Sequence, residues 1–369
     1  MKQLILRYVL ASGLFLLFNF KSLAQFRKYS NEFLNIGAGA RALGMGGAQI
    51  ASVSDGTAGY WNPAGLMNTQ YNPNLALMHA EYFGGIGKFD FAGIAIPTND
   101  ENKNFGVSIL RFAVDDIPNT LFLVNPDGSV DYNNISTFSS ADMALLLSYA
   151  QTKQLQNGEL HMGGSVKIIR RTVGSFANAW GFGIDLGVQY QKDDWRFAAV
   201  LRDATSTYNI WRFTFTDREK EALYLTNNDI PVRSSELTAP RLVVGAGKHF
   251  NISDKINIYA EANLNLTFDG KRNTVFSFNP ISIDPNFGLE ATFNESLFLR
   301  AGISNFQRAL ADGDTLNQKK VWIFQPSLGA GFKMGNTYVD YSFTNLANQS
   351  NPLYTHVFSL KFDLIKKDK

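Results

Sequence analysis

The residue types that most often perform catalysis are few in this sequence and are not grouped. The four histidines, His79, His161, His249 and His356, are never three to five residues apart, so no zinc-binding spacing exists. There is no Gly-x-Ser-x-Gly nucleophile elbow, and with no cysteine there are neither thiolates nor disulfides. A Ser–His pair assembled across separate strands stays open. We expect no catalytic residues, no metal and no cofactor.

Two glycine-containing stretches need attention because such loops can bind phosphates. Gly85–Phe89 lacks the Ser or Thr and the leading spacing of a P-loop. Gly181, Gly183 and Gly187 fall inside an unbroken alternation of polar and apolar residues, which is typical of a strand and not of a dinucleotide-binding turn. The net charge of +2, without a run of Lys or Arg, also argues against nucleic acid as a partner.

Long segments with a period of two residues dominate the chain from residue 74 onward. In Ile256–Thr267, for example, polar and apolar residues alternate without a slip. Segments of about 9 to 13 residues are longer than a usual soluble strand and suit a tilted strand that crosses a membrane. The fourteen segments are 74–82, 87–96, 104–112, 140–151, 160–172, 179–191, 194–203, 240–249, 255–267, 284–293, 296–305, 322–333, 336–344 and 355–364.

The connections between these segments are sorted by parity. Those after even-numbered segments are short, such as Lys192-Asp193, whereas most after odd-numbered ones are longer, such as Ala113–Ser139 and Ala204–Ala239. Bacterial outer-membrane barrels have an even strand number, short periplasmic turns and long outer loops. The sequence therefore predicts an all-β protein, a transmembrane antiparallel β-barrel of about 14 strands in the bacterial outer membrane.

A soluble all-β domain is the alternative, since half-buried strands also alternate. Its polar faces would be its solvated surface and would be rich in Lys and Glu. Here the polar faces combine glycines with scattered charges of both signs, which suits a crowded lumen in which opposite charges pair. These charges are Lys88, Asp90, Lys167, Asp185, Arg196, Arg202, Arg241, Glu261, Glu290 and Arg300.

The first residues look like a secretory signal. Lys2 and Arg7 are followed by the apolar stretch Tyr8–Phe20, and Ser22-Leu23-Ala24 has small residues where a signal peptidase cuts. An uncleaved anchor is the alternative. We predict three parts: a signal peptide over residues 1–24, a Gly-rich hatch over 25–72 and the barrel over 73–369.

The segment from 25 to 72 is rich in Gly and Ala and has no strand alternation. It is too short, and too poor in large apolar residues, to bury a core of its own as a separate periplasmic domain. We therefore expect a hatch inside the barrel lumen, with tight turns where glycines cluster. The candidate hatch residues are Gly37, Gly39, Arg41, Gly44, Gly46, Gly47, Trp61, Asn62 and Pro63.

The predicted outer loop Ala204–Ala239 is long and carries aromatic and arginine side chains, the types that are enriched at binding hot spots. It is expected either to bind a protein partner or to fold as a lid over the barrel mouth. The candidate partner-binding residues are Trp211, Arg212, Phe213, Arg218 and Tyr224. The loop Ala113–Ser139 is the next candidate.

Asn31–Gly47, followed by Tyr60–Leu66, resembles the N-terminal signature of the PorV/PorQ-like outer-membrane proteins, which belong to the FadL-like superfamily. The resemblance implies an outer-membrane barrel with a hatch and a role in type IX secretion. That role is to bind the C-terminal domains of exported cargo and pass the cargo to the surface attachment machinery. The implied partners are this cargo, other secretion-system proteins and outer-membrane lipids.

The chain departs from that pattern in two places. The usual Pro-Asp before Ala40-Arg41 is absent, and the chain continues past Phe362 where many barrels end on an aromatic residue. The second functional hypothesis is a FadL-like channel for hydrophobic small molecules. Because the predicted lumen faces are mainly small, polar or charged, the sequence favours the secretion role over the channel.

Overall fold

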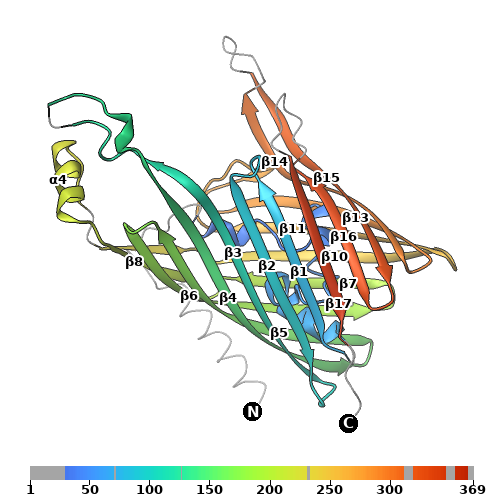
Figure 1. Cartoon of the computed structure of the whole chain (residues 1–369). Coiled ribbons are helices and arrows are strands. Elements are labelled where there is room, and N and C mark those ends of the chain that lie inside the picture. Colours follow the sequence, from blue (N-terminus) through green and yellow to red (C-terminus); the bar gives the residue numbers. More distant parts are fainter. Residues whose placement is uncertain are drawn as a thin grey trace.

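The strands of this protein form a single closed antiparallel sheet (Figure 1). The computed structural model describes residues 30–69, 72–125, 127–230, 233–310, 319–345 and 354–364. The sheet closes because β1 (Asn74–Tyr82) pairs with β17 (Thr355–Asp363) along its whole length. In the described part of the chain, every helix is too short or too polar to cross a membrane.

Fourteen strand positions make up the barrel wall. Two of these positions are each occupied by two short strands placed end to end. β7 and β8 share one position and both pair with β6. β9 and β10 share the next position, where β9 pairs with β8 and β10 pairs with β7. Besides β1 and β17, the wall contains β2 (Gly87–Pro97), β3 (Lys103–Asn119), β4 (Ser136–Leu155), β5 (Gly158–Val173), β6 (Ala177–Lys192), β7 (Trp195–Arg202), β8 (Thr207–Phe213), β9 (Arg233–Thr238), β10 (Arg241–Ser253), β11 (Ile256–Thr267), β13 (Ser282–Phe293), β14 (Leu297–Leu310), β15 (Lys320–Met334) and β16 (Thr337–Thr344).

All fourteen predicted segments are strands, so the predicted barrel is confirmed. The largest differences are at β3 and β4, which continue several residues farther toward their shared connection, where the short helix η3 (Tyr132–Asn134) lies. Connections at one end are short: 98–102, 156–157, 193–194, 254–255, 294–296 and 335–336. The opposite end carries the long connections, including 268–281 with the two-residue strand β12 (Phe276–Ser277).

The outer surface of the barrel is largely apolar. Large side chains are exposed there in every part of the wall, among them Phe105, Phe182, Leu289, Leu328 and Phe358. Water would make such a surface costly, whereas lipid accommodates it, and outward apolar bands are the mark of outer-membrane barrels. The predicted location in the bacterial outer membrane is thereby supported.

The prediction that Lys88 and Asp90 face the lumen is wrong. Phe89, with no exposed surface, and Phe91 point inward, so Lys88 and Asp90, which alternate with them along β2, point outward. Their charges are satisfied on the wall: Lys88 Nζ lies 2.9 Å from Asp115, and Asp90 lies 2.7 Å from the His79 ring. The sequence misled because aromatic residues here occupy the inner face.

The prediction of one long loop over Ala204–Ala239 is also wrong. β8 and β9 pair with each other and extend the wall, and the connection between them contains the helix α4 (Asp217–Leu225) (Figure 1). Asp203 and Ser206 have positive φ values of 52° and 59°, a conformation that breaks a strand. This break separates β7 from β8. It also interrupts the alternation of polar and apolar residues, so the sequence pattern does not reveal that the strand continues.

Residues 30–69 lie inside the barrel. They contain η1 (Glu32–Asn35), α2 (Ala40–Gly44), α3 (Ala58–Trp61) and η2 (Pro63–Asn68), all short because glycines and prolines interrupt them. Most of these residues are buried. α2 contacts the wall at β14–β17, and η2 contacts it at β2–β6, so the segment reaches opposite sides of the lumen.

Candidate functional site

The N-terminal segment is hydrogen-bonded to the wall in many directions. Several of these bonds use its backbone, which has few partners within such short helices. The bonds are Ala40 N to Ser359 Oγ (2.6 Å), Ala51 N to Glu261 Oε1 (2.9 Å), Asn286 Nδ2 to Gly46 O (2.8 Å), Ser165 Oγ to Gly59 O (3.1 Å) and Asn104 Nδ2 to Leu66 O (2.8 Å). Polar lumen side chains therefore hold this segment in place.

The candidate hatch residues lie within this segment, and two of its glycines touch the wall. A Cβ on Gly44 would lie 3.1 Å from Gly329 Cα, and one on Gly46 would lie 2.8 Å from Ile303 N. Gly37, Gly39, Gly46 and Gly47 all have positive φ values. Larger residues would strain these positions or push the segment off the wall.

Trp61, Asn62 and Pro63 join α3 to η2. Trp61 Nε1 donates to Ala38 O at 2.7 Å, which ties the two halves of the segment together. Asn62 Nδ2 donates to Val188 O of β6 at 3.1 Å, and its Oδ1 accepts from Ala64 N as the cap of η2. Pro63 is the first residue of η2, where a missing N–H costs nothing.

A chain of buried ion pairs starts at Arg41. Its guanidinium donates two hydrogen bonds to Glu290 of β13, at 2.9 and 2.8 Å. Arg300 of β14 contacts the same Glu290 at 2.6 Å and Asp340 of β16 at 2.7 Å. Buried charges are stable only when they are paired in this way.

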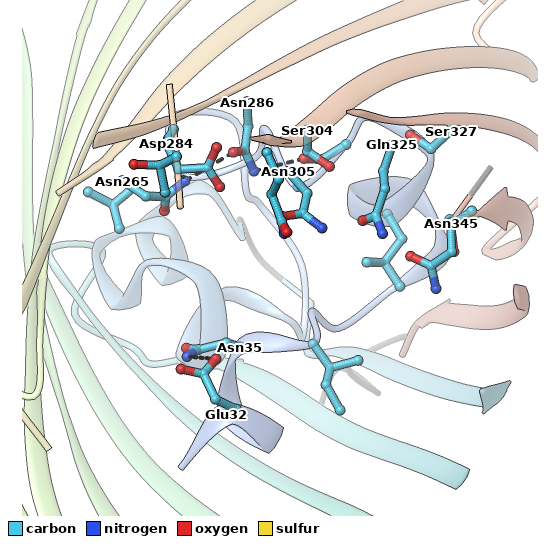
Figure 2. Close-up of a pocket in the computed structure, with 18 of the residues that line it drawn as sticks. Glu32, Asn35, Asn265, Asp284, Asn286, Ser304, Asn305, Gln325, Ser327 and Asn345 are labelled. Carbon is cyan, nitrogen blue, oxygen red and sulfur yellow. Dashed lines mark hydrogen bonds between the residues drawn. The ribbon is translucent and has the colours of Figure 1, made fainter. Parts of the chain in front are cut away.

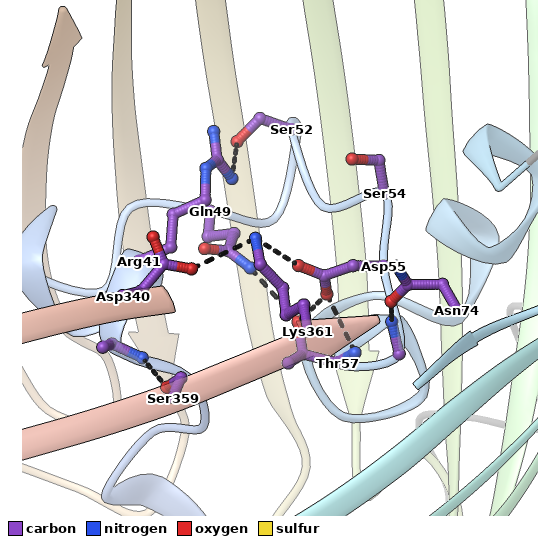
Figure 3. Close-up of polar contacts among 12 residues, drawn as sticks. Arg41, Gln49, Ser52, Ser54, Asp55, Thr57, Asn74, Asp340, Ser359 and Lys361 are labelled. Carbon is purple, nitrogen blue, oxygen red and sulfur yellow. Dashed lines mark hydrogen bonds and ion pairs between the residues drawn. The ribbon is translucent and has the colours of Figure 1, made fainter. Parts of the chain in front are cut away.

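The chain of ion pairs returns to the N-terminal segment through Lys361 of β17 (Figure 3). Its ammonium lies 3.4 Å from Asp340 and 3.3 Å from Asp55, between the two carboxylates. Burial pushes the pKa of Asp55 up, but the Lys361 cation and the Thr57 donors outweigh it and hold that pKa below its ordinary value. Three cations thus balance three carboxylates: Arg41 and Asp55 fasten the segment to β13 and β17, and residues of β14 and β16 complete the chain between them.

A cavity of about 710 Å³ separates the segment from the end of the barrel with long connections. Its volume lies within the usual range for small-molecule sites. The segment contributes the apolar side chains Leu43, Ile50, Tyr60 and Trp61, while the wall contributes mostly amides, hydroxyls and charges. Figure 2 shows the wall residues Asn265, Asp284, Asn286, Ser304, Asn305, Gln325, Ser327 and Asn345 facing Glu32 and Asn35 across this space.

Sequence reasoning did not find this cavity. Its lining comes from strands and connections far apart in the chain, and only the closed barrel brings them together. Each lining strand does carry a polar inner face, which is the one signal that the sequence held. In the described residues no group of three or more His, Asp or Glu could hold a metal ion.

The predicted partner-binding residues separate into two places. Trp211, 8% exposed, points inward from β8 and lies under the Arg171 guanidinium at 5.0 Å, with Phe213 stacked beside it. Arg218 and Tyr224 are on α4, where Arg218 covers the Phe122 ring at 4.2 Å. Arg212, also on β8, is exposed. A common binding surface for all five therefore remains only a prediction.

No protein-family model matches the chain, and no curated protein matches it. Solved structures of outer-membrane channels do share its fold. The CymD monoaromatic hydrocarbon channel superposes with a TM-score of 0.54 at 14% identity, over 90% of this chain and 99% of that one. The Pseudomonas putida toluene transporter TodX gives a TM-score of 0.54 at 14% identity, over 92% and 100% of the two chains. The Ralstonia pickettii toluene transporter TbuX gives 0.51 at 12% identity, over 89% and 99%.

These likenesses establish a barrel fold of the FadL type. They do not support the PorV/PorQ-like assignment. They also overturn the predicted role in type IX secretion and cargo handling, because these three proteins, which match over 99–100% of their own length, are a hydrocarbon channel and two toluene transporters. The prediction failed because short N-terminal glycine motifs describe the segment inside the barrel and not what the barrel does.

Proposed function

We propose that this protein is an outer-membrane channel for small hydrophobic molecules, and that the cavity above the N-terminal segment is where such a molecule first binds. The observation that carries the proposal is the cavity itself, about 710 Å³ at the end of the barrel with long connections. By the parity of the connections, this end faces the outside of the cell. The shared fold with hydrocarbon channels points the same way.

The cavity has the mixed lining that fixes a small ligand. Tyr60 and Trp61 offer flat apolar contact from below, and Leu43 and Ile50 lie beside them. Amides and hydroxyls on the wall, such as Asn286 and Ser304, supply directional hydrogen bonds. A compact molecule with an apolar body fits this lining, since few apolar side chains extend the cavity toward a long acyl chain.

In this proposal the N-terminal segment acts as the hatch. It forms the floor of the cavity and is bonded to opposite sides of the wall. A ligand bound on Trp61 must displace part of this segment, or pass beside it, to leave the cavity. The buried ion pairs of Arg41 and Asp55 then keep the segment attached while the ligand passes.

The test is uptake of labelled xylene by intact cells that carry the protein in their outer membrane, compared with cells that carry the empty vector. Ser304→Trp places a bulky side chain in the cavity and is expected to reduce uptake toward the empty-vector rate. Leu328→Trp, whose site faces outward and is 55% exposed, is the matched control and is expected to leave uptake unchanged. Equal uptake with and without the wild-type protein would overturn the proposal.

A further inference from the structure

Two arginines lie opposite each other on the wall of the cavity. Arg202 is the last residue of β7 and Arg241 the first of β10, and the antiparallel register pairs them directly. Both belong to the cavity lining. Directly opposed residues on one face have Cβ atoms about 5 Å apart, so two like charges are held side by side.

Neither guanidinium has an ion-pair partner in the described part of the chain. Arg202, only 7% exposed, lies over the rings of Tyr60 and Trp61 at 5.2 and 5.6 Å, and its Nε has no hydrogen-bond partner there. Arg241 donates to Asn35 Oδ1 at 2.5 Å, a neutral acceptor. Ring faces and an amide do not neutralise two adjacent charges.

Several other cations inside this barrel do have carboxylate partners. Lys167 lies 2.8 Å from Asp185 and 2.5 Å from Asp203, and Arg300 holds Glu290 and Asp340. The prediction that lumen charges pair is thus confirmed for these cations and wrong for Arg202 and Arg241. An unpaired, buried pair of like charges is costly unless an anion arrives to share it.

The nearby carboxylates are engaged elsewhere or stand apart. Asp203 is held by Lys167 and also accepts from Thr207 at 2.5 Å. Glu32 accepts from Asn35 at 2.8 Å and lies 3.7 Å from Arg272. Asp284 lines the cavity from β13, and its Oδ1 has no hydrogen-bond partner in the described residues. None of these carboxylates forms an ion pair with Arg202 or Arg241 in the described residues, so an incoming anion is drawn to the two guanidiniums.

We propose that Arg202 and Arg241 bind a carboxylate on the transported molecule, and that the channel therefore prefers a compact aromatic acid to a neutral aromatic molecule of the same size. Two guanidiniums can each donate to a carboxylate, which matches their fork geometry. Tyr60 and Trp61 pack under Arg202 and line the same cavity, so an aromatic body joined to that carboxylate would lie beside their rings. Asn265 on β11, the strand next to β10, and Asn286 on β13 line the same side of the cavity and suit a hydroxyl on the ring. This inference rests on the proposed function of the cavity.

Calorimetry on the purified full-length barrel in detergent tests this subsite with benzoate and with benzamide, which has the same shape and no charge. We expect benzoate to bind at least about tenfold more tightly than benzamide. Arg241→Gln is expected to weaken benzoate by about tenfold to a hundredfold and to leave benzamide unchanged. Arg241→Lys, which keeps the charge, should restore part of the loss.

The matched control is Arg170→Gln. Arg170 lies on the outer face of β5, where its guanidinium covers the exposed Trp180 ring at 5.0 Å, and it does not line the cavity, so its removal should leave benzoate binding unchanged. Equal binding of benzoate and benzamide, or equal losses in the Arg241 and Arg170 variants, would overturn the subsite. If octanoate binds tightly and benzoate does not, the inferred preference for a compact aromatic molecule is wrong. If xylene uptake is normal while benzoate is not preferred, the channel stands and only this inference fails.

Discussion

Gly46 of the N-terminal segment lies against Gly302 of β14 so closely that a Cβ on Gly302 would overlap the Gly46 amide nitrogen. The contact joins two residues far apart in the chain, each lacking a side chain at the point where the backbones meet. It explains why glycine is needed on both sides: the segment fits the lumen only where the wall leaves room. The first prediction follows from this contact.

Gly46→Ala should loosen the segment while the barrel still inserts. The new Cβ would meet Ile303 N at 2.8 Å, and overpacking of this kind costs about 1–3 kcal/mol beyond the strain of a positive φ. Protease digestion from the periplasmic side should then cut the segment faster. Gly84→Ala is the control, because Gly84 also has a positive φ (68°) but has nothing within 4 Å. Equal protection in both variants would show that the segment does not pack against β14.

The ion pairs of Lys361 lead to a second prediction. Lys361→Met leaves Asp55 and Asp340 without their shared cation, and breaking a buried pair in this way costs about 3–5 kcal/mol. The temperature at which the barrel unfolds on semi-native gels should fall clearly. Lys220→Met serves as the control, since Lys220 pairs with Asp217 on the exposed helix α4 and should leave that temperature unchanged. An identical temperature in the two variants would contradict a fastening role for Lys361.

Closure of the sheet through β1 and β17 predicts behaviour in detergent. The mature protein should run faster on an unheated gel than after boiling, because the closed sheet keeps the folded chain compact. Val357→Pro should remove this shift: Val357 pairs with Ala80 in the seam, and proline cannot donate to the ladder. A wild-type protein with no shift would contradict the closed barrel.

Trp211 gives a prediction about the extended part of the wall. Trp211→Ala removes the ring that Arg171 covers and Phe213 stacks on, and loss of a buried Trp costs about 3–5 kcal/mol. The hairpin of β8 and β9 should become sensitive to protease added outside the cell. Tyr208→Ala on the same strand is the control, because Tyr208 points outward and is 54% exposed. Similar cleavage of both variants would mean that Trp211 does not hold the hairpin.

The strands could be predicted from the sequence because each has one apolar face toward lipid and one polar face toward the lumen. Ile256–Thr267 shows this alternation without a slip, and its strand has those bounds. The rule failed at Lys88 and Asp90 because Phe89 and Phe91 point inward, where the Phe91 ring packs against Tyr60 of the inner segment. It also failed after Asp203, where a positive φ interrupts the strand before the alternation resumes at Thr207.

The cavity and its arginines could not be predicted in the same way. Arg202 and Arg241 were recognised as lumen charges, but their direct opposition depends on the register between β7 and β10. That register depends in turn on where the wall strands break, between β7 and β8 and between β9 and β10, a feature that alternation does not encode. Whether a charged side chain has an ion-pair partner depends on the residues that surround it in the folded protein. The residues around Arg202 and Arg241 come from parts of the chain that are far apart in the sequence.

Glycines on the inner face of the wall determine which N-terminal segment can pack inside this barrel. Gly93, Gly163, Gly288, Gly302 and Gly329 each face the N-terminal segment at a point where a Cβ would crowd it. The strand number sets the diameter of the lumen, but this pattern of glycines makes the inner surface of the wall complementary in shape to one particular segment. A segment transplanted from another fourteen-stranded barrel would clash with side chains of this wall at some points and leave gaps at others. The sequences of the N-terminal segment and of the wall glycines can therefore change only together, and a chimeric barrel must exchange both.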